Sequence, residues 1–157
     1  MNSERDNRIL GDPGTPAFQV DRYPFYLVNR LTSRYNASLE PTLREIHLDN
    51  PRWRVLMILC ERGALGVRDI ADAAVIPLST MTRIIQRMAG AELVVLSVSG
   101  DDARVTLVSL TTIGDSKLEQ ARVVASQLYL RVIRGLTARD ADRLVDLLGR
   151  LYRNLED

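Results

Sequence analysis

The feature of this sequence that most constrains its fold is a pair of short helical segments followed at once by a β-hairpin. Residues 67–74 and 79–91 both carry apolar side chains at helical spacing, and only a tight break at Ile76-Pro77 separates them. The pattern then changes to β-branched runs on both sides of the turn-forming sequence Ser99-Gly100-Asp101-Asp102. This order of elements predicts a winged helix-turn-helix whose hairpin forms the wing.

Two further helices are expected before this unit. Apolar residues recur at helical spacing from Pro24 to Ile46, although Pro41 should kink or interrupt this long first helix. The next helix begins at a capping residue, either Asp49 or Asn50.

Two more helices are expected after the hairpin. Thr111 is placed to cap a helix that runs to about Arg134, and Thr137 with Asp140 resembles a capping box ahead of a final helix. Both helices carry strong apolar stripes. The fold class is therefore mainly α with a small β-hairpin wing, in the order of four helices, the hairpin and two helices.

The length of 157 residues suits one domain with a real hydrophobic core. Residues 1–20 place glycine and proline among polar neighbours, so they are interpreted as a flexible N-terminal arm. Residues 21–157 form the single winged helix domain, because the segments between the predicted elements are too short to separate folding units.

The composition argues against several kinds of site. Cys60 and His47 are the single cysteine and the single histidine, so no cluster of such ligands exists to hold a metal. No nucleophile with a base, carboxylate pair or phosphate loop is recognisable, so we expect no enzyme and no cofactor. No apolar run approaches the roughly 18 residues of a membrane span, and the first residues lack the plan of a secretory signal. A cytoplasmic protein is expected.

The overall charge carries little information about function. A formal net charge of +1 is small for a nucleic-acid-binding protein. Every basic side chain except Lys117 is arginine, whose planar fork suits phosphates and guanine edges. A codon bias towards arginine explains the same observation.

The helix at residues 79–91 has an outward face that suits DNA. Its apolar stripe leaves a polar face free, and an α-helix fits the major groove, where such side chains meet base edges and phosphates. An ordinary solvated helix face is the alternative, and the hairpin that follows favours DNA. The candidate DNA-contacting residues of this helix are Ser79, Thr80, Thr82, Arg83 and Arg87.

The wing offers one more DNA-contacting candidate. Arg104 can reach the neighbouring minor groove, and Asp102 can support it through an ion pair. An Asp-x-Arg sequence in a turn is commonly only a surface pair, so its meaning depends on the surrounding pattern.

That pattern resembles a known family. The run Asp102-Ala-Arg104-Val-Thr-Leu-Val108-Ser-Leu110-Thr111-Thr-Ile-Gly114 matches every specified position of the D-x-R-x-x-x-V-x-L-T-x-x-G signature of the multiple-antibiotic-resistance regulator (MarR) family. The run from His47 to Leu56, H-L-D-N-P-R-W-R-V-L, looks like the family's G-L-T-x-x-Q-W-R-V-L. Val75 and Glu92 depart from the family, since glycine is common at both positions.

The resemblance implies a homodimeric transcriptional regulator. Residues 51–111 correspond to the DNA-binding core, and residues 21–48 and 112–157 to helices that intertwine with those of a partner. The terminal apolar stripes permit this assignment independently. Two recognition helices about one DNA turn apart, roughly 34 Å, imply a palindromic operator on double-stranded DNA. The family commonly represses transcription until a small aromatic or phenolic anion binds.

His47, Trp53 and Arg54 are candidates for binding such an effector, because they lie where the first two long helices meet. Arg54 can pair with a carboxylate and Trp53 can stack on a ring. The alternatives are that Trp53 belongs to the core and that His47 is an ordinary junction residue. Cys60 follows Leu56 and Leu59 on the apolar side of its helix, so its thiol is expected to be buried and unreactive.

The alternative function is a winged helix that serves as a protein-interaction or structural module without specific DNA binding. A near-neutral charge permits it. Arg83, Arg87 and Arg104 discriminate between the two hypotheses, since such a module does not need them.

Overall fold

A computed structural model describes residues 6–100, 102 and 104–156 of the chain, so two residues at the tip of the expected hairpin lie outside the described part. The elements in the described ranges are α1 (Asn7–Leu10), the 3-10 helix η2 (Val20–Arg22), α2 (Pro24–Glu45), α3 (Asn50–Arg62), β1 (Leu65–Gly66), α4 (Val67–Ala74), α5 (Leu78–Gly90), β2 (Val94–Val98), β3 (Thr106–Leu110), α6 (Thr112–Val132) and α7 (Ala138–Arg153). The predicted winged helix-turn-helix is confirmed.

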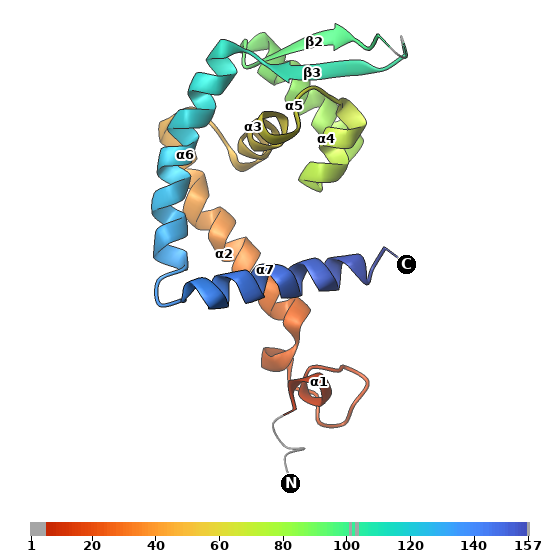
Figure 1. The fold of residues 1–157 in the computed structure, drawn as a ribbon, viewed down its shortest axis with the longest axis vertical. Coiled ribbons are helices and arrows are strands. Elements are labelled where there is room, and N and C mark those ends of the chain that lie inside the picture. The colour runs from red at the N-terminus through yellow and green to blue at the C-terminus, as the bar shows by residue number, and fades with distance from the viewer. Residues whose placement is uncertain (1–5, 101, 103, 157) are drawn as a thin grey trace.

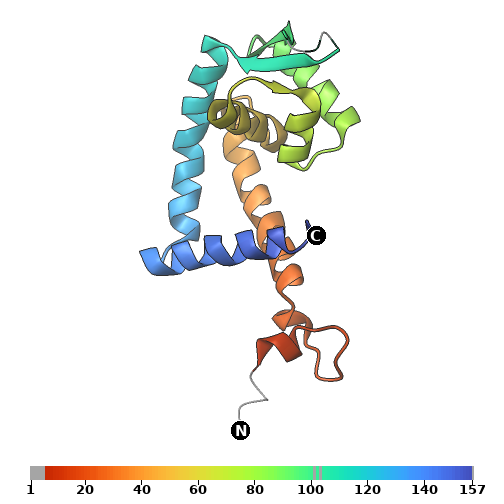
Figure 2. The same cartoon turned by 45° about the vertical axis from the view of Figure 1, so that its right-hand side comes forward.

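The helices divide the molecule into a winged helix unit and a long helical extension. α2 and α6 pack against each other and lead away from the unit formed by α3, α4, α5 and the sheet (Figure 1). α7 begins at the end of α6 that lies away from the wing, and in both views α2 extends past the level of α7 (Figure 2). The N-terminal segment projects beyond that end.

One hydrophobic core holds the winged helix unit to the nearer ends of α2 and α6. It includes Leu39 and Leu43 of α2, Val55 and Leu56 of α3, and Leu118 of α6, all at most 1% exposed. The expected stripe of α5 is confirmed, because Met81, Ile85 and Met88 are buried. The core ends partway along α2, since Leu27 and Leu31 are exposed.

The sheet contains one strand that the hairpin pattern did not indicate. β3 pairs antiparallel with β2 on one side and with β1 on the other. β1 has only two residues, too few for an alternating pattern to be visible. It fixes the start of α4 beside the wing.

Several helix ends follow the predicted capping chemistry. The Asp49 side chain accepts a hydrogen bond from the Arg52 backbone N–H at α3, and Thr111 accepts one from Gly114 at α6. Thr137 and Asp140 form the predicted capping box of α7. The predicted interruption at Pro41 is wrong, because α2 continues to Glu45.

Gly114 marks the closest approach between the wing and α6. A Cβ atom at this position would lie 2.0 Å from the Leu93 carbonyl oxygen. The backbone N–H of Thr111 donates to that same oxygen at 3.2 Å. Only a glycine therefore allows α6 to start against the first residues of the hairpin.

The N-terminal segment, expected as a flexible arm, contains α1 and η2 in its described part. The Gln19 N–H donates to the Leu10 carbonyl oxygen at 2.8 Å, and Asp6 caps α1. Composition did not predict these elements, because the loop between them holds all the glycine and proline of residues 1–20.

Candidate nucleic-acid interface

The outward face of α5 is free of the core. Ser79, Thr80, Thr82, Arg83 and Arg87 are all exposed. The Thr82 hydroxyl donates to the Leu78 carbonyl oxygen at 2.9 Å, so it is engaged with its own helix. Pro77 precedes α5 and supplies no side-chain cap, which leaves the first N–H groups of the helix free for a ligand oxygen.

The two arginines of this face are uncommitted. Within the described part of the chain, neither Arg83 nor Arg87 has an ion pair or a side-chain hydrogen bond, and the pairs that do form lie on other helices. A guanidinium that keeps its charge and all its donors free is ready for phosphates and base edges.

The wing residue Arg104 is exposed, but its relation to Asp102 differs from the prediction. The Asp102 carboxylate accepts a hydrogen bond from the Arg104 backbone N–H at 2.9 Å, and no ion pair joins the side chains of these two described residues. Asp102 therefore stabilises the turn, because an aspartate side chain commonly accepts a hydrogen bond from the backbone N–H two residues later. Within the described ranges, the Arg104 guanidinium has no ion pair.

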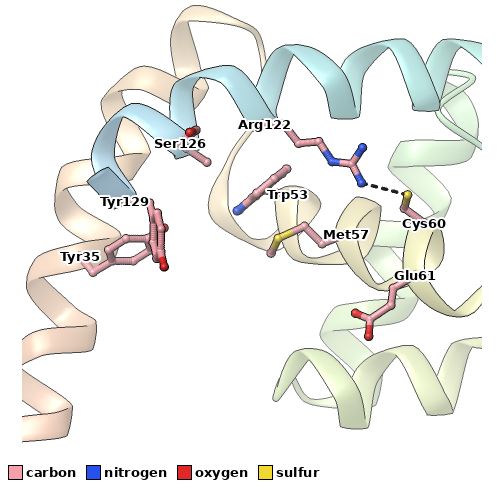
Figure 3. A pocket seen from close by; sticks show the side chains of 9 residues that line it. Tyr35, Trp53, Met57, Cys60, Glu61, Arg122, Ser126 and Tyr129 are labelled. Atoms are coloured by element: carbon pink, nitrogen blue, oxygen red, sulfur yellow. Dashed lines mark hydrogen bonds between the residues drawn. The ribbon is translucent and has the colours of Figure 1, made fainter. Parts of the chain in front are cut away.

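A pocket of about 710 Å³ lies where α2, α3 and α6 meet (Figure 3). Trp53 and Met57 of α3, Tyr35 of α2, and Arg122 and Tyr129 of α6 line it. Its wall combines three aromatic side chains with polar groups that include the Glu61 carboxylate, and small-molecule sites commonly join an apolar wall to a few polar groups. It lies between the long helices and the winged helix unit.

The structure brings only one of the three effector candidates to this pocket. Trp53 lines it, although the residue is 7% exposed and also belongs to the core. The Arg54 guanidinium instead donates to the Ala74 carbonyl oxygen at 3.1 Å and fixes α3 to α4. His47 is exposed in the turn after α2, at a φ of 59°.

The cation of the pocket is Arg122, which is not among the residues predicted to bind an effector. Its guanidinium forms an ion pair with Glu119 and donates to Cys60 Sγ at 3.2 Å (Figure 3). Glu119 raises the pKa of Arg122. Arg122 directly follows Ala121, a buried residue of α6. A basic residue beside the apolar stripe of this helix is the one sequence signal that could have indicated it.

The predicted burial of Cys60 is wrong. Its side chain is exposed and lines the same pocket. Cys60 lies seven residues after Trp53, and such residues share one helix face. That face looks into the pocket, whereas Leu56 and Leu59 turn towards the core.

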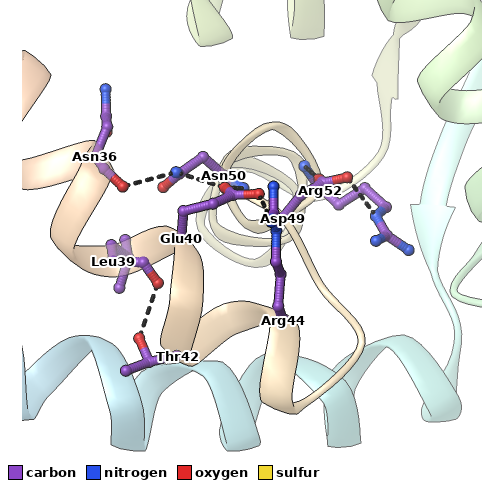
Figure 4. A network of polar contacts seen from close by, with 8 residues as sticks. All are labelled: Asn36, Leu39, Glu40, Thr42, Arg44, Asp49, Asn50 and Arg52. Atoms are coloured by element: carbon purple, nitrogen blue, oxygen red, sulfur yellow. Dashed lines mark hydrogen bonds and ion pairs between the residues drawn. The ribbon is translucent and has the colours of Figure 1, made fainter.

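A polar network fixes α3 to α2 at the junction beside the pocket (Figure 4). Glu40 Oε2 accepts hydrogen bonds from the Asn50 backbone N–H at 3.1 Å and from Asn50 Nδ2 at 2.8 Å. Asn50 Nδ2 also donates to the Asn36 carbonyl oxygen at 3.1 Å. The Arg44 guanidinium holds the other oxygen of Glu40 at 3.1 Å. The winged helix unit is therefore tied to the long helix by directed contacts.

No described helix is long and apolar enough to cross a membrane. No group of three or more described His, Cys, Asp or Glu side chains is arranged to hold a metal ion.

Comparisons with known proteins give a consistent picture. The MarR family model matches residues 48–106. The HTH-type transcriptional repressor IacR of Pseudomonas putida is 39% identical over 145 residues, which cover 92% of this chain and 87% of that protein. The crystal structure of a MarR family regulator from Silicibacter pomeroyi aligns with a TM-score of 0.80 and 25% identity, over 87% of this chain and 92% of that one.

A further similar structure concerns the regulation of DNA binding of Bordetella bronchiseptica BpsR by 6-hydroxynicotinic acid. It aligns with a TM-score of 0.72 and 26% identity, over 82% of this chain and 97% of that chain. These similarities extend well beyond the wing signature and support DNA-binding regulation over both the interaction module and an enzyme. The chain belongs to the MarR family of DNA-binding transcriptional regulators.

Proposed function

We propose that the protein is a cytoplasmic, effector-responsive repressor that binds a palindromic operator as a homodimer. Residues 51–111 bind DNA, and residues 21–48 and 112–157 join two copies. The observation that carries the proposal is the exposed polar face of α5, whose two arginines have no ion pair with any described residue. In such a dimer the two α5 helices enter successive major grooves about 34 Å apart.

The side chains of this interface have different tasks. Ser79, Thr80 and Thr82 lie near the start of α5 with Arg83, where a recognition helix meets base edges. Arg87 lies about one helical turn later, where it meets the sugar-phosphate backbone of the DNA. Arg104 extends the interface from the wing to the neighbouring minor groove. This division predicts which residues affect sequence preference and which affect affinity alone.

Fluorescence anisotropy titrations test the DNA contacts. The duplex is the DNA upstream of the protein's own gene, compared with an unrelated duplex at one fixed salt concentration. Arg83→Ala is expected to lower operator affinity about tenfold and to relax base preference. Arg104→Ala is expected to weaken binding to both duplexes with less effect on preference. Wild-type binding by both variants would contradict the proposal.

The pocket beside Trp53 is the proposed effector site. Its aromatic wall and Arg122 suit a small aromatic or phenolic anion, and the 6-hydroxynicotinic acid of BpsR has this chemistry. Arg122 already pairs with Glu119, so a carboxylate in the pocket competes with Glu119 for the guanidinium. Because α3 and α6 both line the site, a ligand there alters how the winged helix unit sits on the long helices.

Trp53 is the single tryptophan of the chain, so its fluorescence reports on the pocket directly. Aromatic acids, with 6-hydroxynicotinic acid among them, are expected to change this fluorescence saturably and to release the operator. Arg122→Ala should weaken binding of the acid about tenfold or more, because a charge-assisted hydrogen bond is lost. Arg54→Ala is the control, since Arg54 does not line the pocket. An equal loss in both variants would locate the effector elsewhere.

A further inference from the structure

The sheet brings the start of α4 against the base of the wing. β1 pairs with β3, with Gly66 opposite Leu107, and α4 begins at the next residue. A Cβ atom placed on Gly66 would lie 3.5 Å from Val105 Cγ1, so the two segments are in close contact. Residues far apart in the sequence thereby share one surface.

A hollow of about 400 Å³ lies between these two segments. Arg68 and Asp69 line it from the first turn of α4, and Arg104 lines it from the wing. Both arginines are exposed, and neither guanidinium has an ion pair or hydrogen bond within the described ranges. With two guanidinium groups and the single Asp69 carboxylate, the charge of the hollow is positive.

The position of the hollow relates it to the DNA backbone. α4 is the first helix of the helix-turn-helix pair, and in such domains the first helix crosses the backbone while the second enters the major groove. The wing reaches the neighbouring minor groove from the other side. A duplex that contacts both α5 and the wing therefore carries one backbone strand past the hollow. Phosphate oxygens accept charge-assisted hydrogen bonds from guanidinium groups.

We propose that this hollow binds one phosphate of the operator backbone between Arg68 and Arg104. The inference rests on the proposed DNA-binding function and adds Arg68, on α4, to the interface. A phosphate bound here fixes the distance between the recognition helix and the wing. This contact does not depend on the base sequence of the DNA. Asp69 opposes this phosphate, so its carboxylate limits the affinity.

Anisotropy titrations over a series of salt concentrations test the proposal with the full-length protein. Arg68→Ala is expected to lower affinity about tenfold for the operator and for an unrelated duplex alike. The slope of log affinity against log salt should fall by about 0.9 for each half-site, the contribution of one phosphate. Asp69→Asn should change affinity in the opposite direction, by about threefold, because it removes the opposing charge.

Arg8→Ala is the matched control. Arg8 is an exposed arginine of α1, outside the residues assigned to DNA binding and to dimerisation and at the end of the molecule away from the wing (Figure 1). It should leave the salt slope unchanged. A salt slope for Arg68→Ala equal to that of this control would overturn the inference, and so would a loss confined to the operator, which indicates a base contact. Either result leaves the DNA-binding function intact as long as the wild-type protein binds its operator.

Discussion

At the scale of single residues, three helices end on a side chain forced into the left-handed region. His47, Val75 and Glu92 have φ values of 59°, 54° and 58°. After each, the next N–H returns to a carbonyl five residues back, as in Ile76 N–H to Ala71 O at 3.0 Å. This arrangement is the Schellman motif, in which glycine is usual because a Cβ atom strains the conformation.

Val75→Gly is expected to stabilise the protein by about 1 kcal/mol. Valine is β-branched and pays most for this conformation, and its side chain is 86% exposed, so little packing is lost. Val75→Ala, which keeps a Cβ atom, should recover only part of the gain. Urea denaturation followed by circular dichroism measures the difference. A lower midpoint for the glycine variant would show that strain at Val75 is not significant.

The family resemblance makes all three positions visible, since His47 aligns with the glycine of G-L-T and glycine is common at Val75 and Glu92. The effector residues were harder to predict. Adjacent residues on a helix point about 100° apart, so Trp53 enters the pocket while Arg54 reaches α4. Choosing between them requires the position of α6 relative to α3, and Arg122 lies on that distant helix.

At the scale of elements, periodicity and capping residues predicted the six helices from α2 to α7 and the hairpin of β2 and β3. Each predicted cap is a local interaction, such as Thr111 with Gly114, so neighbouring residues suffice to specify it. β1 was missed because its two residues form a strand only by pairing with β3. The interruption predicted at Pro41 does not occur, because α2 continues through this proline to Glu45.

Glu40→Ala is expected to loosen the junction of α2 and α3. Glu40 accepts two hydrogen bonds from Asn50 at a half-buried position, and its removal leaves those donors without this partner. The expected loss is about 1–2 kcal/mol in the free energy of unfolding. Glu45→Ala, an exposed substitution in the same helix, is the control and should lie within about 0.5 kcal/mol of the wild type. Equal urea midpoints for the two variants would contradict a role for the network.

At the scale of the whole molecule, this chain exposes more surface than a compact monomer does. Its accessible surface is 11634 Å², whereas a compact protein of 17.7 kDa exposes about 7,900 Å². α7 contributes no buried residue, and Leu144, Leu147, Leu148 and Leu151 of its apolar stripe are all exposed. An excess of this size is of the order that obligate dimers bury.

Leu148→Glu is therefore expected to separate the dimer. A carboxylate on the stripe of α7 would have to lose its hydration in the interface, and this cost opposes association. Analytical ultracentrifugation should show a dimer for the wild type and a monomer for the variant at micromolar concentration. Operator affinity should fall much further than with Arg83→Ala, because each half-site is then bound separately.

Val95→Glu is the control for this experiment. Val95 is similarly exposed, at 52%, but lies on β2 at the opposite end of the molecule from α7 (Figure 1). The variant should remain dimeric, since a charge there is far from the stripe. A dimeric Leu148→Glu protein with unchanged sedimentation would mean that another surface joins the two copies. The exposed apolar residues at the start of α2, Phe25, Leu27, Val28 and Leu31, would then be the next to carry a charge.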